Sequence, residues 1–172
     1  MWRGTKLLVL FAVLAAVALG AAPGAVASPP IEASGTFTYV ASTFNSMRTV
    51  GGNTIIDLSA TVSYTGTFTG TSTVHGTLMF HSDGTGAQFP PWRANFHEVE
   101  IFTGTVNGVS GTVTFDLRGS NDPTGALKAT DVIVSASGGL AGLHGVLSLV
   151  GTVPAPSGPV GTYTGQIEFG SP

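Results

Sequence analysis

Two glutamates with the spacing of a shared strand face are the first candidates for chemistry. They lie in the stretch ANFHEVEIFTGTV, residues 94–106. In a β-strand, Glu98 and Glu100 would share one face with Phe96 and Phe102, because successive side chains alternate. One interpretation is a solvated strand side near a rim. The other is a pair of carboxyl groups in a barrel mouth, where desolvation would raise a pKa and create a general acid or base.

The four histidines are the next candidates. His75 and His81 share a face if their strand is regular, whereas His97 and Glu98 are neighbours and face opposite sides. The sequence has no His-x-His pair and no HExxH motif, and a metal site needs three or four converging ligands. We therefore predict structural or surface roles for the histidines, including His144, with no metal and no cofactor. No catalytic triad and no phosphate-binding loop can be read from the spacing, so enzymatic activity stays open.

A stiff apolar connection, GAQFPPWRANF, precedes the glutamates. Exposed aromatic side chains on a loop favour either of two structures. Trp92 plugs one end of a barrel, or the loop forms a lip over a ligand cavity at the barrel mouth. The candidate ligand-binding residues are Phe89, Trp92, Arg93, His97, Glu98 and Glu100.

The N-terminus has the pattern of a secretory signal peptide. Arg3 and Lys6 precede an unbroken apolar run over residues 7–19, and small residues end at Ala27. The run is shorter than the roughly 20 residues of a membrane-spanning helix. We predict cleavage after Ala27, no stable membrane insertion afterwards, and a secreted, extracytoplasmic location.

The predicted mature chain keeps 145 of the 172 residues after removal of 27. That length suits one domain, which we place at residues 33–172 after a short N-terminal extension at 28–32. Without Arg3 and Lys6, four basic and nine acidic side chains remain, a net charge of −5. This balance argues against a nucleic-acid partner. The chain has no cysteine, which excludes disulfides and thiol chemistry.

Short alternating runs rich in Thr, Val, Phe and Tyr predict strands throughout the mature chain. In GTVTFDLRG, residues 111–119, Val113, Phe115 and Leu117 should face inwards. In YTGTFTGT, residues 64–71, the threonines should form the solvated face of one strand. Asn-Gly at residues 107–108 indicates a hairpin. Glycines inside strands favour closure, so we predict an all-β fold, a small closed antiparallel barrel of about eight strands.

Several glycine motifs resemble the bacterial family called domain of unknown function 3224. They lie in FTGTSTVHGTLMFHSDGTGAQF, FTGTVNGVSGTVTF, SGGLAGLHGVLSLVGT and GTYTGQIEF, and together the resemblance covers residues 33–169. The matching residues are Phe68, Gly70, Gly104, Gly108, Gly111, Ser137, Gly138, Leu140, Gly142, Leu143 and Gly145.

The resemblance implies a fold and no substrate. The family is similar in fold to the allene-oxide-cyclase-like barrels, which the plant dirigent proteins share, and its activity is not established. This chain departs from the pattern by its signal peptide and by the proline-bearing loop GTVPAPSGPVG. Many relatives look cytoplasmic, so an intracellular role would not transfer.

Three functions follow from these observations. We expect a non-catalytic secreted barrel that binds a small apolar or amphipathic ligand. The first alternative is an isomerase or cyclase, as in the related barrels, which would need Glu98, Glu100 or His97 to point inwards. The second is a structural or interaction module of the cell envelope. A closed barrel should be monomeric, whereas an open seam would allow a strand-edge dimer.

Overall fold

The computed structural model describes residues 29–81, 93–154 and 158–170. These residues form strands and connections, with no helix among them. None of them lies in a helix long and apolar enough to cross a membrane. The strands are β1 (Ile31–Val50), β2 (Asn53–Gly66), β3 (Phe68–Phe80), β4 (Ala94–Val106), β5 (Val109–Asn121), β6 (Ala126–Gly138), β7 (Leu143–Thr152) and β8 (Val160–Phe169).

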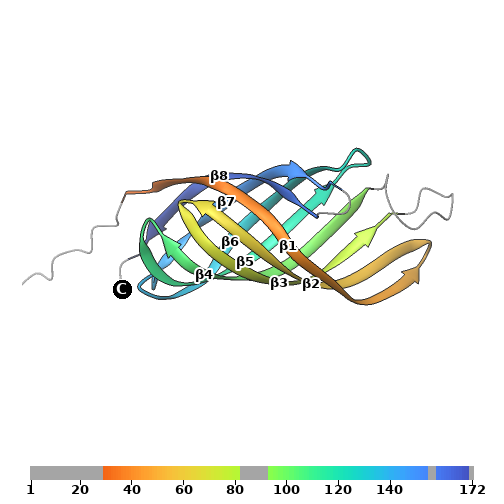
Figure 1. Ribbon diagram of the computed structural model, residues 1–172, viewed down its shortest axis with the longest axis horizontal. Helices are drawn as coiled ribbons and strands as arrows, with labels where there is room; N and C mark the ends of the chain where they lie inside the picture. Colours follow the sequence, from red (N-terminus) through yellow and green to blue (C-terminus); the bar gives the residue numbers. More distant parts are fainter. Residues whose placement is uncertain (1–28, 82–92, 155–157, 171–172) are drawn as a thin grey trace, which may run out of the picture.

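The eight strands form one antiparallel sheet that closes on itself (Figure 1). Each strand pairs with the next along the chain, and β8 returns to pair with β1 from Ile31–Ile167 to Thr38–Val160. The predicted all-β antiparallel fold of about eight strands is therefore confirmed. The strands follow one another around the sheet in the order in which they occur along the chain. The predicted signal peptide lies outside the described residues and stays a prediction.

Alternation along each strand separates an apolar interior from a polar exterior. Val113, Phe115 and Leu117 of β5 are buried, as predicted, at 0%, 1% and 3% exposure. Their neighbours Thr112 and Thr114 lie on the outer face with partial exposure. The interior is therefore a packed core in which each strand contributes every second side chain.

One end of the interior is filled by aromatic rings. The ring of Phe68 packs against Phe102, Phe115 and Tyr163 with centroid distances of 5.4, 5.7 and 5.8 Å. Tyr64 packs edge-on against Phe102 at 5.9 Å. These tilted and edge-to-face arrangements are the favoured geometries for aromatic pairs, and they close that end of the barrel.

The stretch YTGTFTGT departs from the prediction of a single strand. β2 ends at Gly66 and β3 begins at Phe68, so the chain turns within it. Gly66 has a φ of +99°, which side chains other than glycine rarely adopt, and a Cβ there would lie 2.4 Å from the Ser34 carbonyl oxygen. The alternation survives the turn because Tyr64 and Phe68 both face inwards, but from different strands.

At the opposite end, β1 and β2 extend as a hairpin arm (Figure 1). The ladder between β1 and β8 ends at the Thr38–Val160 pair. Residues 40–50 of β1 are exposed and pair with β2, with register shifts after Tyr39 and Phe44. The choice between monomer and strand-edge dimer stays a prediction.

Candidate functional site: carboxyl groups inside the barrel

Three acidic side chains lie inside the barrel. Glu98 and Glu100 of β4 and Asp131 of β6 are exposed by only 3%, 1% and 0%. The solvated-rim interpretation of the glutamate pair is therefore wrong, because the registers turn their face of β4 inwards. Asp131 was not among the sequence-based candidates. Its signal was the run ALKATDVIV, in which Leu127, Ala129, Asp131 and Ile133 alternate with outward residues.

Strand register brings the three acids together. Glu98 of β4 pairs with Leu117 of β5, and Leu117 pairs with Asp131 of β6. The two carboxyl groups therefore lie in one row around the barrel wall, on either side of Leu117. On the other side of Glu98, β3 presents Gly76, where a Cβ would lie 2.3 Å from the Glu98 Cγ. The missing side chain makes the room that the Glu98 side chain occupies.

The two glutamates have hydrogen-bond partners. The Tyr39 hydroxyl donates to Glu98 Oε2 at 3.0 Å. The Ser72 hydroxyl donates to Glu100 Oε1 in a short hydrogen bond, and Glu100 also hydrogen-bonds with Tyr64. These donors come from β1, β2 and β3, so three neighbouring strands supply hydrogen bonds to the two glutamates of β4.

Asp131 differs from the glutamates because neither of its carboxyl oxygens has a hydrogen-bond partner among the described residues. An unpaired polar group buried away from water costs about 1–3 kcal/mol, and a charged one costs more. A fully buried, unpartnered carboxyl group is therefore unfavourable for folding. Asp131 is for this reason the strongest single candidate for a functional residue in the core.

Burial changes the proton affinity of all three acids. Desolvation raises the pKa of Glu98 from its ordinary 4.5 to about 7, against the hydrogen bond from Tyr39. Desolvation also raises the pKa of Glu100. The pKa of Asp131 is raised well above its ordinary value by desolvation and by the charges of Glu100 and Glu98. The cluster therefore holds protons at a pH where ordinary carboxyl groups are ionised.

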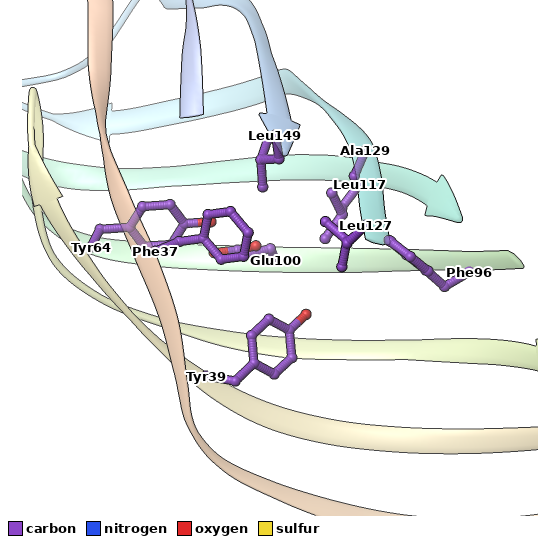
Figure 2. Close-up of a pocket in the computed structure, with 9 residues that line it drawn as sticks. All are labelled: Phe37, Tyr39, Tyr64, Phe96, Glu100, Leu117, Leu127, Ala129 and Leu149. Atoms are coloured by element: carbon purple, nitrogen blue, oxygen red, sulfur yellow. The ribbon is translucent and has the colours of Figure 1, made fainter. Parts of the chain in front are cut away.

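A small cavity lies beside the cluster (Figure 2). Its volume is about 10 Å³, room for about one water molecule. Glu100 is its acidic lining residue, and the Tyr39 hydroxyl points into the space between the labelled side chains. The other lining residues are aromatic or aliphatic: Phe37, Tyr39, Tyr64, Phe96, Leu117, Leu127, Ala129 and Leu149.

The remaining predicted site residues lie elsewhere. His97 is on the outer face of β4, where its Nε2 lies 3.2 Å from Asp116 Oδ1. Arg93 is exposed just before β4. Phe89 and Trp92 lie outside the described residues. The structure thus brings together Glu98 and Glu100 of the predicted set, adds Asp131, and leaves His97 and Arg93 outside the barrel.

The other histidines occupy surface or partly exposed positions. His75 is exposed beside Ser59 Oγ at 3.0 Å, and His144 pairs with Glu168 at 2.9 Å. His81 is half-buried directly after β3, where the described range 29–81 ends. Within the described ranges, no three His, Asp or Glu side chains are arranged to hold a metal ion.

Comparisons with known proteins identify the family and the fold. The model of the family described as protein of unknown function (DUF3224) matches residues 33–153. A crystal structure of a protein with unknown function from this family, from Shewanella oneidensis MR-1, has a similar fold, with a TM-score of 0.57. The likeness covers 84% of this chain and 100% of that chain at 16% sequence identity. The comparison with curated proteins returned no match.

Proposed function

The chain belongs to the DUF3224 family, whose function is unknown, and from its own geometry we propose that it binds a small amphipathic molecule inside the barrel without transforming it. The N-terminal pattern supports a secreted, extracytoplasmic location for this activity. The observation that carries the proposal is the set of three carboxyl groups buried inside the barrel, one of which, that of Glu100, lines an otherwise apolar cavity.

Burying three acidic side chains in the core is unfavourable for folding, and this cost supports a binding role for them. Apolar residues of similar size at Glu98, Glu100 and Asp131 would remove the cost of burying three acids in a core. A barrel that served only as a scaffold would gain nothing from them. A binding site gains orientation, because a few polar groups in an apolar cavity select which end of a ligand enters first.

The cavity limits the ligand to a small one, and it must widen on binding. Its present volume accommodates about one water molecule. Tyr39 and Phe96 are the partly exposed aromatic residues of its wall. Rotation of these two side chains would enlarge the cavity without breaking a β-ladder, because neither backbone has to move.

Native mass spectrometry of the mature protein, purified gently from its own culture medium, tests the proposal. We expect a retained small molecule, and a polypeptide that begins at Ser28. Ala129→Leu fills the cavity and should abolish the retained mass. Thr130→Leu, on the exposed outer face of the same strand, should leave it unchanged. A bare protein, even after exposure to a mixed lipid extract, would show that the barrel is simply filled.

One observation favours a second function, the isomerase or cyclase chemistry of the allene-oxide-cyclase-like and dirigent-like barrels. Glu98 has its pKa raised by desolvation to about 7, the range in which a carboxyl group can both donate and accept a proton near neutrality. An acid–base isomerase would exchange a ligand proton with solvent. In D₂O, the ligand released from the unaltered protein would then gain deuterium, and the ligand from Glu98→Gln would not. If the ligand gains no deuterium with the unaltered protein, the isomerase function is excluded and the binding function remains.

A further inference from the structure

We propose that the ligand of the barrel is an amphipathic amine, whose ammonium group lies among Glu98, Glu100 and Asp131 and whose apolar part packs against Phe96 and Leu127. This inference rests on the proposed binding function and names the chemical class of its ligand. Three independent features of the described residues support it: the missing counter-charge, the unpaired oxygens of Asp131 and the spacing of the acids.

The first feature is the absence of a positive side chain inside the described barrel. Arg48, Arg93, Arg118 and Lys128 are all exposed. The ion pairs that they form, Arg48 with Asp57 and Arg118 with Asp116, lie on the outer surface. Three interior acids therefore face one another without a cation from the described chain, and a cationic ligand would supply it.

The second feature is Asp131. Both of its oxygens are buried and unpartnered, whereas Glu98 and Glu100 already accept hydrogen bonds from Tyr39 and Ser72. A primary ammonium group carries three N–H donors. It has enough donors to satisfy Asp131 and to donate to a second carboxyl group of the cluster as well. A ligand hydroxyl has one donor and would leave most of this acceptor capacity unused.

The third feature is the spacing of the acids, which favours an organic cation over a metal ion as the ligand. The three carboxyl groups do not converge as metal ligands, since no such group of three exists among the described residues. Hydrogen bonds from an ammonium group to carboxylates are about 2.7–2.9 Å long and tolerate wider separation of the acceptors than a metal ion does. The aromatic wall, which includes Tyr39 and Tyr64, also suits an ammonium group through cation–π attraction.

Binding must release a proton. Below pH 7, the raised pKa of Glu98 keeps its carboxyl group largely protonated, and an ammonium group requires at least one carboxylate opposite it. Each ammonium bound below pH 7 therefore displaces one carboxyl proton to the solvent. The groups that face this cluster are Tyr39 on β1, Tyr64 on β2 and Ser72 on β3, and none of them carries a positive charge.

Isothermal titration calorimetry with three six-carbon probes tests the inference. We expect n-hexylamine, protonated at pH 6, to bind, hexan-1-ol to bind at least about tenfold more weakly, and hexanoate not to bind. Titrations in two buffers of different ionisation enthalpy should reveal about one proton released per amine bound. Asp131→Asn should weaken amine binding at least about tenfold. Asp116→Asn, which alters a partly exposed acid on the outer face of the neighbouring strand β5, should not.

The outcomes separate this inference from the proposed function. Equal binding of the amine and the alcohol would overturn the amine class and leave the binding function standing. The same holds if a neutral or anionic molecule is the retained ligand. If no probe binds and no molecule is retained, both proposals fail. Should Asp131→Asn not fold, Glu98→Gln makes the same test, with loss of amine affinity expected and unchanged affinity contradicting the inference.

Discussion

Asp131 is the residue whose position is least favourable for folding, so its side chain gives the clearest sign of a functional role. It occupies an interior position between Leu117 and Leu147 in the strand registers, where an aliphatic side chain would suit the core. Its carboxyl group instead lies buried with no partner. The proton that it retains lowers the cost of burial but leaves a polar group unsatisfied. This cost at a single position is what a ligand-binding role explains and what a purely structural role does not.

We therefore expect Asp131→Val to stabilise the protein. Removing the unpaired carboxyl group should raise the free energy of unfolding by about 1–3 kcal/mol at pH 7. Urea denaturation followed by circular dichroism measures the change. Thr130→Val, the exposed neighbour on the same strand, should change it by less than about 0.5 kcal/mol. A loss of stability in Asp131→Val would mean that the carboxyl group makes a favourable interaction, contrary to our interpretation.

At the scale of the elements, β3 and β4 shape the site together. β4 supplies both glutamates, and β3 supplies Ser72 as a donor and Gly76 as open space. The Gly76 position faces Glu98 directly, so the inner face of β3 is recessed where the acid lies. This complementarity depends on the register between two neighbouring strands, and a side chain at Gly76 would disturb it.

Gly76→Ala should destabilise the barrel and displace Glu98. The added Cβ would lie 2.3 Å from the Glu98 Cγ and 2.7 Å from its Cα, and one of these contacts is with the backbone. Overpacking of this kind costs about 1–3 kcal/mol. Thermal denaturation measures the loss, and Thr73→Ala, exposed on the outer face of β3, is the control. A Gly76→Ala variant as stable as the control would show that the strands can shift to accommodate the methyl group.

At the scale of the whole molecule, the buried acids couple stability to pH. Their pKa values are raised in the folded protein, so the folded protein binds more protons than the unfolded chain between the ordinary and the raised pKa. Stability therefore falls as pH rises through that interval. The partly exposed Asp57 and Asp116 act oppositely, because hydrogen bonds from Ser46 and Arg118 lower their pKa values, and their contribution is lost in acid.

We expect the protein to be more stable at pH 5 than at pH 8. For Glu98, a pKa raised from 4.5 to about 7 corresponds to about 3 kcal/mol of stability lost across that range. Denaturation midpoints measured at intervals of pH test this expectation. Glu98→Gln has no proton to lose and should flatten the profile, whereas Glu32→Gln, exposed on β1, should not. A stability of the unaltered protein that is constant from pH 5 to pH 8 would contradict the assignment.

The sequence by itself determined the local features of this protein. Alternation at period two identifies strands and places Glu98 and Glu100 on one face of β4, because this periodicity belongs to each chain segment alone. The Asn-Gly turn at residues 107–108 also follows locally, since both residues have positive φ values, of 50° and 82°. Glycine and threonine content then predicted an all-β fold with short connections.

Only the tertiary structure decided which face of β4 is the interior and which residues meet there. Asp131 joins Glu98 because β5 and β6 pair with a register shift between Thr114 and Phe115. That irregularity moves every later partner by one position, and a shift of one position exchanges interior and exterior faces. The pairing of β6 with β5, the strand that neighbours β4, thus placed the third acid, since register depends on contacts between segments and not on the residues of either segment alone.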